Sequence, residues 1–149
     1  MSSLRYFASD KDSHFAGALA QNAIENESIN MPADWQSNSK QKCVISELMI
    51  ESDQNLDWEI ILWSTKDYAD TNLDSDRGVT RIPVPASTGE QVAGTGQYYY
   101  ENPLAQSIDY IDEDNRSQVH MGLINRDITA KNAGATGEVV VRIGATLTL

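Results

Sequence analysis

The sequence predicts an all-β protein: an antiparallel β-sandwich or jelly roll with an N-terminal arm or short helix. Residues 138–149 alternate between an apolar and a mixed face, and this period of two fits a strand rather than a helix. Further strand-like segments recur at short intervals between turns rich in glycine, proline, asparagine and aspartate. Short strands without helical crossovers favour an antiparallel sheet over a parallel α/β sheet.

The N-terminal third is ambiguous. Phe15, Leu19 and Ile24 belong to a helical stripe that follows polar capping residues, and the alternative is an extended arm on a neighbouring subunit. The segment has too few apolar residues to form a core of its own. We therefore divide the chain into an arm or helical segment, residues 1–38, and a β-sandwich domain, residues 39–149. Removal of the arm is expected to leave the sandwich folded.

Two segments in the middle of the chain form a predicted hairpin. Residues 42–51 carry apolar side chains on both faces, which indicates a central strand or a strand covered on its second face. Residues 56–64 follow a polar turn of hairpin length and place Trp58 with two aliphatic side chains on one face. We expect Trp58 to lie in the core. Cys43, the single cysteine, is expected to be a small buried hydrophobic residue.

Three other segments complete the predicted sheets. Residues 118–125 direct apolar side chains inward and His120 outward. Residues 107–112 alternate more weakly. Residues 79–85 contain two prolines, which cannot donate to a sheet ladder, so this stretch is at most an edge strand or an irregular crossing.

Composition limits the classes of function. The chain has 149 residues, the usual size of one domain, and a formal net charge of −11 from 22 acidic and 11 basic residues. Such negative charge opposes contact with phosphates, so direct nucleic-acid binding is disfavoured. The first residues contain no apolar signal core, and no run is long enough to span a bilayer. We expect a protein made in the cytoplasm, with no membrane partner.

Acidic residues suggest a calcium loop. Asp70, Asn72, Asp74 and Asp76 alternate as calcium ligands do, but the positions of the EF-hand glycine and glutamate are occupied by other residues. A solvated acidic loop is therefore preferred, with a non-standard calcium site as the alternative. A second cluster over residues 109–114 is interpreted as a charged strand end that enters a turn. We predict no metal ion and no cofactor.

No catalytic motif is visible. With 22 acidic residues a pair at glycosidase spacing arises by chance. A hydrolytic triad would need His14 or His120 beside a serine and a carboxylate, and no glycine-flanked nucleophile elbow is present. We predict that the chain is not an enzyme and that His120 lies at the surface or in an interface.

Aromatic residues give the candidate binding surface. Exposed rings stack on sugars or anchor protein interfaces. Three consecutive tyrosines in a strand cannot all point into one core, so at least one faces solvent or a partner. The predicted interface residues are Trp35, Trp63, Tyr98, Tyr99, Tyr100 and His120. A carbohydrate-binding module, with Trp63 and the tyrosines as its stacking platform, is the alternative to a protein interface.

The segments LDWEIILWS (residues 56–64) and GTGQYYY (residues 94–100), together with residues 118–149, resemble small virion structural proteins of tailed bacteriophages. The resemblance is to capsid-decoration (cement) proteins with a β-sandwich fold. It implies a non-enzymatic virion protein that forms a homo-oligomer, commonly a trimer, and binds the major capsid protein to stabilise the phage head. Tail and fibre components share this β-rich character, so a tail or fibre component is an alternative placement.

Overall fold

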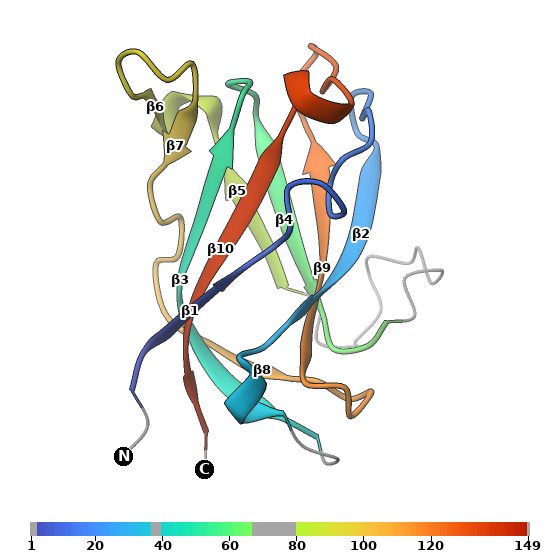
Figure 1. Ribbon diagram of the computed structural model, residues 1–149, viewed down its shortest axis with the longest axis vertical. Helices are drawn as coiled ribbons and strands as arrows, with labels where there is room; N and C mark the ends of the chain where they lie inside the picture. The colour runs from blue at the N-terminus through green and yellow to red at the C-terminus, as the bar shows by residue number, and fades with distance from the viewer. Residues whose placement is uncertain (1–2, 37–39, 67–79, 149) are drawn as a thin grey trace.

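The computed structural model describes residues 3–36, 40–66 and 80–148 and consists of two packed antiparallel sheets (Figure 1). The first sheet has the order β1 (Arg5–Ala8), β10 (Val139–Leu147), β3 (Lys42–Ser52), β7 (Tyr98–Tyr100) and β6 (Gly89–Gln91), and β8 (Ile108–Ile111) also pairs with β3. The second has the order β2 (Ile24–Asn30), β9 (Gln118–Asn125), β4 (Trp58–Trp63) and β5 (Thr80–Val84). The predicted all-β sandwich is confirmed.

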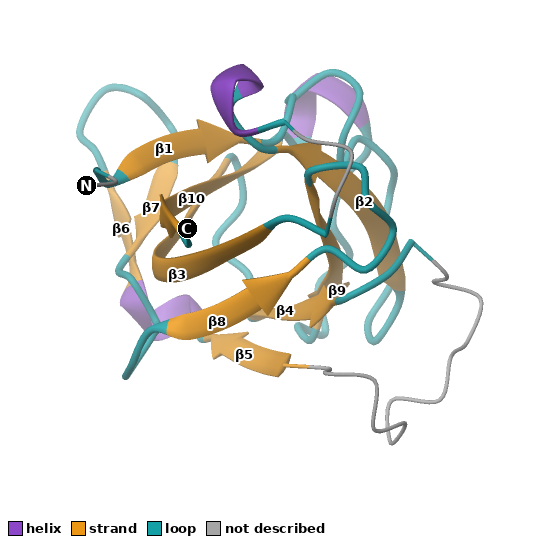
Figure 2. Cartoon of the chain, turned by 90° about the horizontal axis from the view of Figure 1, so that it is seen from below, coloured by secondary structure: helices purple, strands orange, loops and turns teal. Residues whose placement is uncertain are grey.

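Short 3₁₀ turns connect several strands: η1 (Ala33–Trp35), η2 (Ala86–Thr88) and η3 (Gly134–Thr136). Seen from below, β8 lies next to the end of the second sheet formed by β4 and β5, and a small pocket at this place is lined by residues of all three strands (Figure 2). Among the described strands, β5 pairs with β4 alone, and it contains Pro83, as expected for an edge strand. In the part of the chain that the structure describes, no helix has the length and apolar character needed to cross a membrane.

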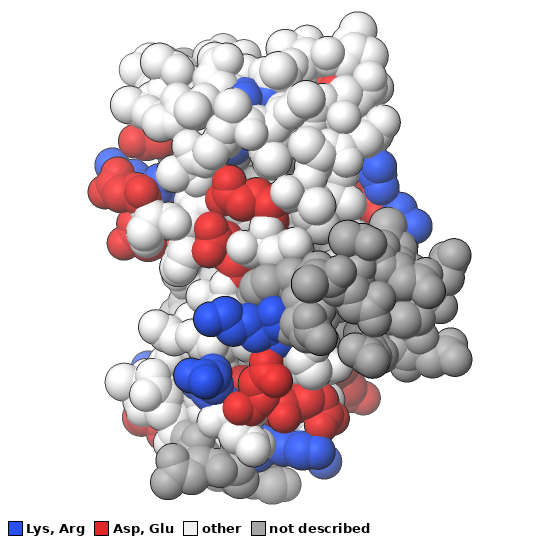
Figure 3. Space-filling view, turned by 90° about the vertical axis from the view of Figure 1, so that its right-hand side faces the viewer, with Lys and Arg blue, Asp and Glu red and all other residues white. Residues whose placement is uncertain are grey.

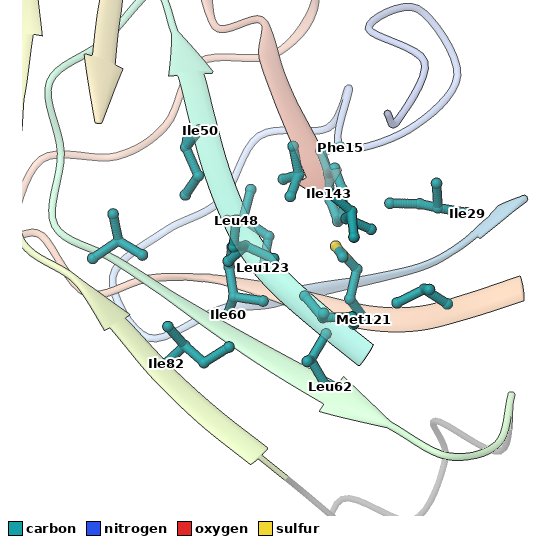
Figure 4. Close-up of a cluster of buried hydrophobic side chains, with 14 of the residues drawn as sticks. Phe15, Ile29, Leu48, Ile50, Ile60, Leu62, Ile82, Met121, Leu123 and Ile143 are labelled. Carbon is teal, nitrogen blue, oxygen red and sulfur yellow. The ribbon is translucent and has the colours of Figure 1, made fainter. Parts of the chain in front are cut away.

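One hydrophobic core fills the space between the sheets (Figure 4). The predicted inward faces of β4, β9 and β10 supply much of it, including Ile60, Leu123 and Ile143, each 0% exposed. Trp58 and Cys43 are buried as predicted, each 1% exposed. Burial raises the pKa of the Cys43 thiol to about 12, so this cysteine is an unreactive core residue.

Strand β3 is a central strand, as its apolar residues predict, and a β-bulge interrupts it. The register with β10 shifts between Gly144 and Ala145, which pair with Glu47 and Ile45, so Ser46 is the extra residue. The bulge reverses the alternation, and Cys43, Ile45, Leu48 and Ile50 therefore all point into the core. Val44 and Met49 lie half-buried on the opposite face.

Asn102 supports this bulge from the segment between β7 and β8. Its Oδ1 accepts a hydrogen bond from Leu48 N at 3.1 Å, and its Nδ2 donates to Ser46 O at 3.2 Å. The amide therefore takes the place of a neighbouring strand where β7 and β8 leave the edge of β3 unpaired.

Replacement of Asn102 by alanine is expected to lower the free energy of unfolding by about 1–3 kcal/mol, because two backbone groups of β3 lose their partners. Asn102→Asp keeps the acceptor and loses the donor, so its loss should be smaller. The exposed neighbour Glu101 provides the matched control. Urea denaturation measures the three variants; equal stability of Asn102→Ala and Glu101→Ala would show that the amide does not hold the bulge.

The N-terminal segment is part of the sandwich, which corrects its description as a separate arm or helix. Strand β1 pairs with β10, and β2 pairs with β9 along seven residue pairs. Phe15 is 0% and Leu19 is 5% exposed within the common core, whereas Ile24 is 37% exposed. The segment between β1 and β2 is non-helical because it is held by distant backbone: Leu19 and Lys131 exchange both backbone hydrogen bonds.

The side chain of Lys131 reinforces this attachment. It is 1% exposed, and its Nζ donates to Gly17 O at 2.6 Å and to Asn132 O at 3.1 Å. Burial lowers the pKa of Lys131, an effect that the nearby Glu25 carboxylate partly offsets. A buried ammonium group thus fixes the loop of residues 15–19 against the segment after β9.

Candidate functional site

The predicted interface residues are mostly buried in the chain itself. Trp35, Trp63 and Tyr100 are only 4–6% exposed, and His120 is 0% exposed. Tyr98 is half-buried against the core, and Tyr99 is 37% exposed. The run of tyrosines therefore alternates as a strand requires. Of the predicted set, Tyr99 is the residue that offers a substantial surface to a partner.

Trp35 and Tyr100 hold the fold together. The ring of Trp35 packs edge-on against Phe7 of β1, with centroids 6.1 Å apart, which joins η1 to the first sheet. The hydroxyl of Tyr100 accepts a hydrogen bond from Leu56 N at 3.0 Å and donates to Asn55 Oδ1 at 2.8 Å. It thereby fixes the turn between β3 and β4.

Trp63 lies on the outward face of the second sheet, where it forms a small buried cluster with Ile61 and Ile124. Its Nε1 donates to Asn26 Oδ1 of β2 at 3.2 Å, although β9 lies between β4 and β2. Gly122 of β9 allows this, because a Cβ at that position would lie 2.7 Å from Asn26 Oδ1. The outward apolar face predicted for this strand exists, but it is already covered.

A charged group flanks this cluster. Glu59 accepts hydrogen bonds from Arg81 Nε at 2.7 Å and from Arg126 Nε at 3.1 Å. Burial raises the pKa of Glu59, but the two arginines outweigh it, and the pKa lies below its ordinary value. Acidic and basic side chains lie next to one another on this side of the molecule rather than in separate patches (Figure 3).

The ion pairs of Glu59 predict that the stability of the folded chain depends on pH. Because its folded pKa is depressed, its stabilisation is fully present above the unfolded pKa of 4.5 and is lost as the pH falls through the folded value. Glu59→Gln should cost about 1 kcal/mol at neutral pH, since both arginines are partly exposed, and less in acid. Thermal melts of both proteins across this range measure the difference. A difference that does not shrink in acid would contradict this assignment.

His120, which was expected at the surface or in an interface, is buried within the chain. It points to the outward face of β9 but is 0% exposed, and both ring nitrogens have partners. Nδ1 lies 2.8 Å from Ser28 Oγ of β2, and Nε2 lies 2.8 Å from Asp112 Oδ1 in the loop after β8. Asp114 Oδ2 lies 3.7 Å from Nε2. We call these four residues the His120 cluster.

Within the His120 cluster, Asp112 is held in place by several hydrogen bonds. Its side chain is 0% exposed, and its two oxygens also accept hydrogen bonds from the backbone nitrogens of Asp114, Arg116 and Gln118 at 2.9–3.0 Å. Burial raises the pKa of Asp112, but the hydrogen bonds from Gln118 N, His120 and Asp114 N outweigh it, so the pKa lies below its ordinary value. The acidic residues at 112–114 thus organise a loop, in addition to ending a strand.

The His120 cluster brings a serine, a histidine and a carboxylate into one hydrogen-bonded line. The three residues of this line are Ser28, Asp112 and His120, and the first lies far from the other two in the sequence, so no local motif reveals the arrangement. The ring nitrogens are used in the order opposite to that of a serine hydrolase: Nδ1 faces the serine and Nε2 the carboxylate. Among the described residues, Asp112, Asp114 and His120 form the group with metal-ligating atoms close together. The acidic loop at residues 70–76, for which a non-standard calcium site was the alternative interpretation, lies outside the described residues.

The outward face of the first sheet carries exposed aromatic and apolar side chains. On edge strand β1, Tyr6 is 55% exposed, and Leu4, just before this strand, is 41% exposed. The Tyr6 ring lies against Gly144 of β10, where a Cβ would be 2.9 Å from the ring, and its hydroxyl donates to Glu47 Oε2 at 2.8 Å. This hydrogen bond raises the pKa of Tyr6. We call this surface, formed by Leu4, Tyr6 and their neighbours on β10 and β3, the Tyr6 face.

A scan against protein-family models finds no family that matches this chain, and a search of curated proteins finds no significant match.

Proposed function

We propose that this chain is a non-enzymatic virion protein that forms a homo-oligomer, a trimer, and binds the major capsid protein of a tailed phage. The observation that carries the proposal is the Tyr6 face. Tyr6 is exposed on β1 and Leu4 just before it, and β1 pairs only with β10 among the described residues. Exposed apolar groups beside an unpaired strand edge favour association with another chain.

The geometry of the Tyr6 face suits an interface. The Tyr6 ring is held in one position by Gly144 and Glu47, so it loses little conformational freedom on binding. Fixed tyrosines of this kind are enriched at the centres of protein interfaces. A stable contact would bury about 1,200 Å² or more in total, and so it would extend from β1 onto the neighbouring strands.

Binding to capsids tests the partner. Particles that lack this protein are mixed with wild type and with Leu4→Ser/Tyr6→Ser, and bound chain is measured by co-sedimentation. Wild type is expected to bind and the double variant to lose binding. Ile128→Ser is the matched control, because Ile128 is 87% exposed on the loop after β9, away from β1. Failure of wild type to bind such particles would refute the capsid assignment.

Carbohydrate binding is a second candidate, favoured by the same exposed ring. A tyrosine held flat on a glycine, with Glu47 beside its hydroxyl, is suited to stacking on a sugar and hydrogen bonding to it. The platform differs from the one expected from the sequence, since Trp63 and Tyr100 are buried. Binding to a glycan array that disappears in Tyr6→Ala but persists in Trp63→Phe would support this function over the virion role.

A further inference from the structure

We propose that Asp112, Asp114 and His120 bind one divalent transition-metal ion, of the Zn²⁺ or Mn²⁺ kind. Their ligand atoms, Asp112 Oδ1, Asp114 Oδ2 and His120 Nε2, all lie within 4.8 Å of one another. Ligands held about 2.0–2.2 Å from a zinc ion are about 3.0–3.5 Å apart. The observed separations of 2.8 Å and 3.7 Å from His120 Nε2 lie on either side of that range, so only small movements would admit the ion.

The arrangement places either a hydrogen or a metal ion between His120 Nε2 and the carboxylates. Two carboxylates face the same imidazole nitrogen, and a lone pair on Nε2 would repel both of them. Without metal, a proton on Nε2 occupies this position and donates to Asp112 Oδ1. When a metal ion binds Nε2, that nitrogen donates its lone pair to the ion, and the proton of the neutral ring moves to Nδ1.

Ser28 and the backbone of the loop hold the ligands in position for metal binding. With the proton on Nδ1, His120 donates to Ser28 Oγ at 2.8 Å, the kind of outer contact that orients metal-bound histidines. Asp112 is fixed by three backbone N–H groups, and Asp114 Oδ2 accepts a hydrogen bond from Lys66 N. The Asp114 side chain is 30% exposed, which gives an ion access from solvent.

The ligand set determines the class of ion. One imidazole and two carboxylates suit Zn²⁺, Mn²⁺ or a related divalent ion, whereas Ca²⁺ and Mg²⁺ prefer oxygen ligands alone. The two carboxylates also balance a divalent charge. Since Asp112 and Asp114 lie after β8 of the first sheet and His120 lies on β9 of the second, the ion would link the two sheets and stabilise the folded chain.

Calorimetric titration of the metal-stripped full chain with ZnCl₂ and MnCl₂ tests the proposal. We expect one ion per chain and a rise in melting temperature. Asp114→Asn removes one charged ligand and keeps an acceptor for Lys66 N, so it should weaken binding about tenfold or more. Asp109→Asn is the matched control, because Asp109 is exposed on β8 outside the His120 cluster, and it should bind like wild type.

Nuclear magnetic resonance of the histidine rings keeps the proposal testable if Asp114→Asn does not fold. In the wild type, zinc should remove the Nε2 proton of His120 and shift that nitrogen, and Ser28→Ala should weaken zinc binding without abolishing it. The proposal is overturned if wild type binds neither ion, if Asp114→Asn binds as tightly as wild type, or if His120 keeps its Nε2 proton when zinc is bound.

Discussion

Deletion of residues 1–30 is expected to abolish folding, in contrast to the expectation for a detachable arm. The deletion removes β1 from the first sheet and β2 from the second, together with the fully buried ring of Phe15. Loss of Phe15 alone, in Phe15→Ala, should cost about 3–5 kcal/mol of a total stability of about 5–15 kcal/mol. Circular dichroism and thermal unfolding would show the absence of a cooperative transition.

Deletion of residues 1–3 is the matched control, because these residues precede both Leu4 of the Tyr6 face and β1, and their loss leaves both strands in place. This shorter deletion should melt like wild type. If the chain that lacks residues 1–30 were soluble and unfolded cooperatively, β1, β2 and Phe15 would be dispensable, and the N-terminal segment would be an arm after all.

Loss of β10 is the second change with a large expected effect. This strand is paired on both sides, with β1 and with β3, and its residues Val139, Val141, Ile143 and Ala145 are each 0% exposed. Deletion of residues 139–149 should therefore give insoluble protein. The single substitution Ile143→Ala should lower the free energy of unfolding by about 2–5 kcal/mol, because it leaves a cavity at the centre of the sandwich.

Arg142 provides the control on the same strand. Its side chain is 48% exposed and pairs with Glu51 at 2.8 Å, so Arg142→Ala should cost no more than about 1 kcal/mol. Chemical denaturation compares the two variants. A soluble chain without β10 that melts cooperatively, or an Ile143→Ala variant as stable as Arg142→Ala, would contradict the central place of this strand.

The sequence predicts the strands that have a buried side along most of their length. One face of each of the strands β4, β9 and β10 packs in the core, and β4 and β9 carry further buried residues on their outward face. Strand β2, with the sequence IENESIN, is paired on one side and mostly half-buried, so it carries few apolar residues and was missed. The bulge at Ser46 was missed because its supports come from residues far away in sequence, among them Asn102.

The candidate sites were predictable only in part. A run of three tyrosines in a strand indicates that at least one ring is exposed. The pairing of β7 with β3 determines that this ring is Tyr99. Gly144, an isolated glycine inside an alternating strand, is a signal of close approach by another group, and Tyr6 is that group. The surroundings of His120 carried no signal in the sequence, because Ser28 is 92 residues away and is brought near by the pairing of β2 with β9.

Sedimentation velocity of the purified protein tests whether the chain associates through the Tyr6 face. Wild type and Ile128→Ser are predicted to sediment as the same oligomer, a trimer, over a wide concentration range, whereas Leu4→Ser/Tyr6→Ser sediments as a folded monomer. A wild type that remains monomeric at the highest concentration, or a double variant that assembles as wild type does, would contradict association through the Tyr6 face.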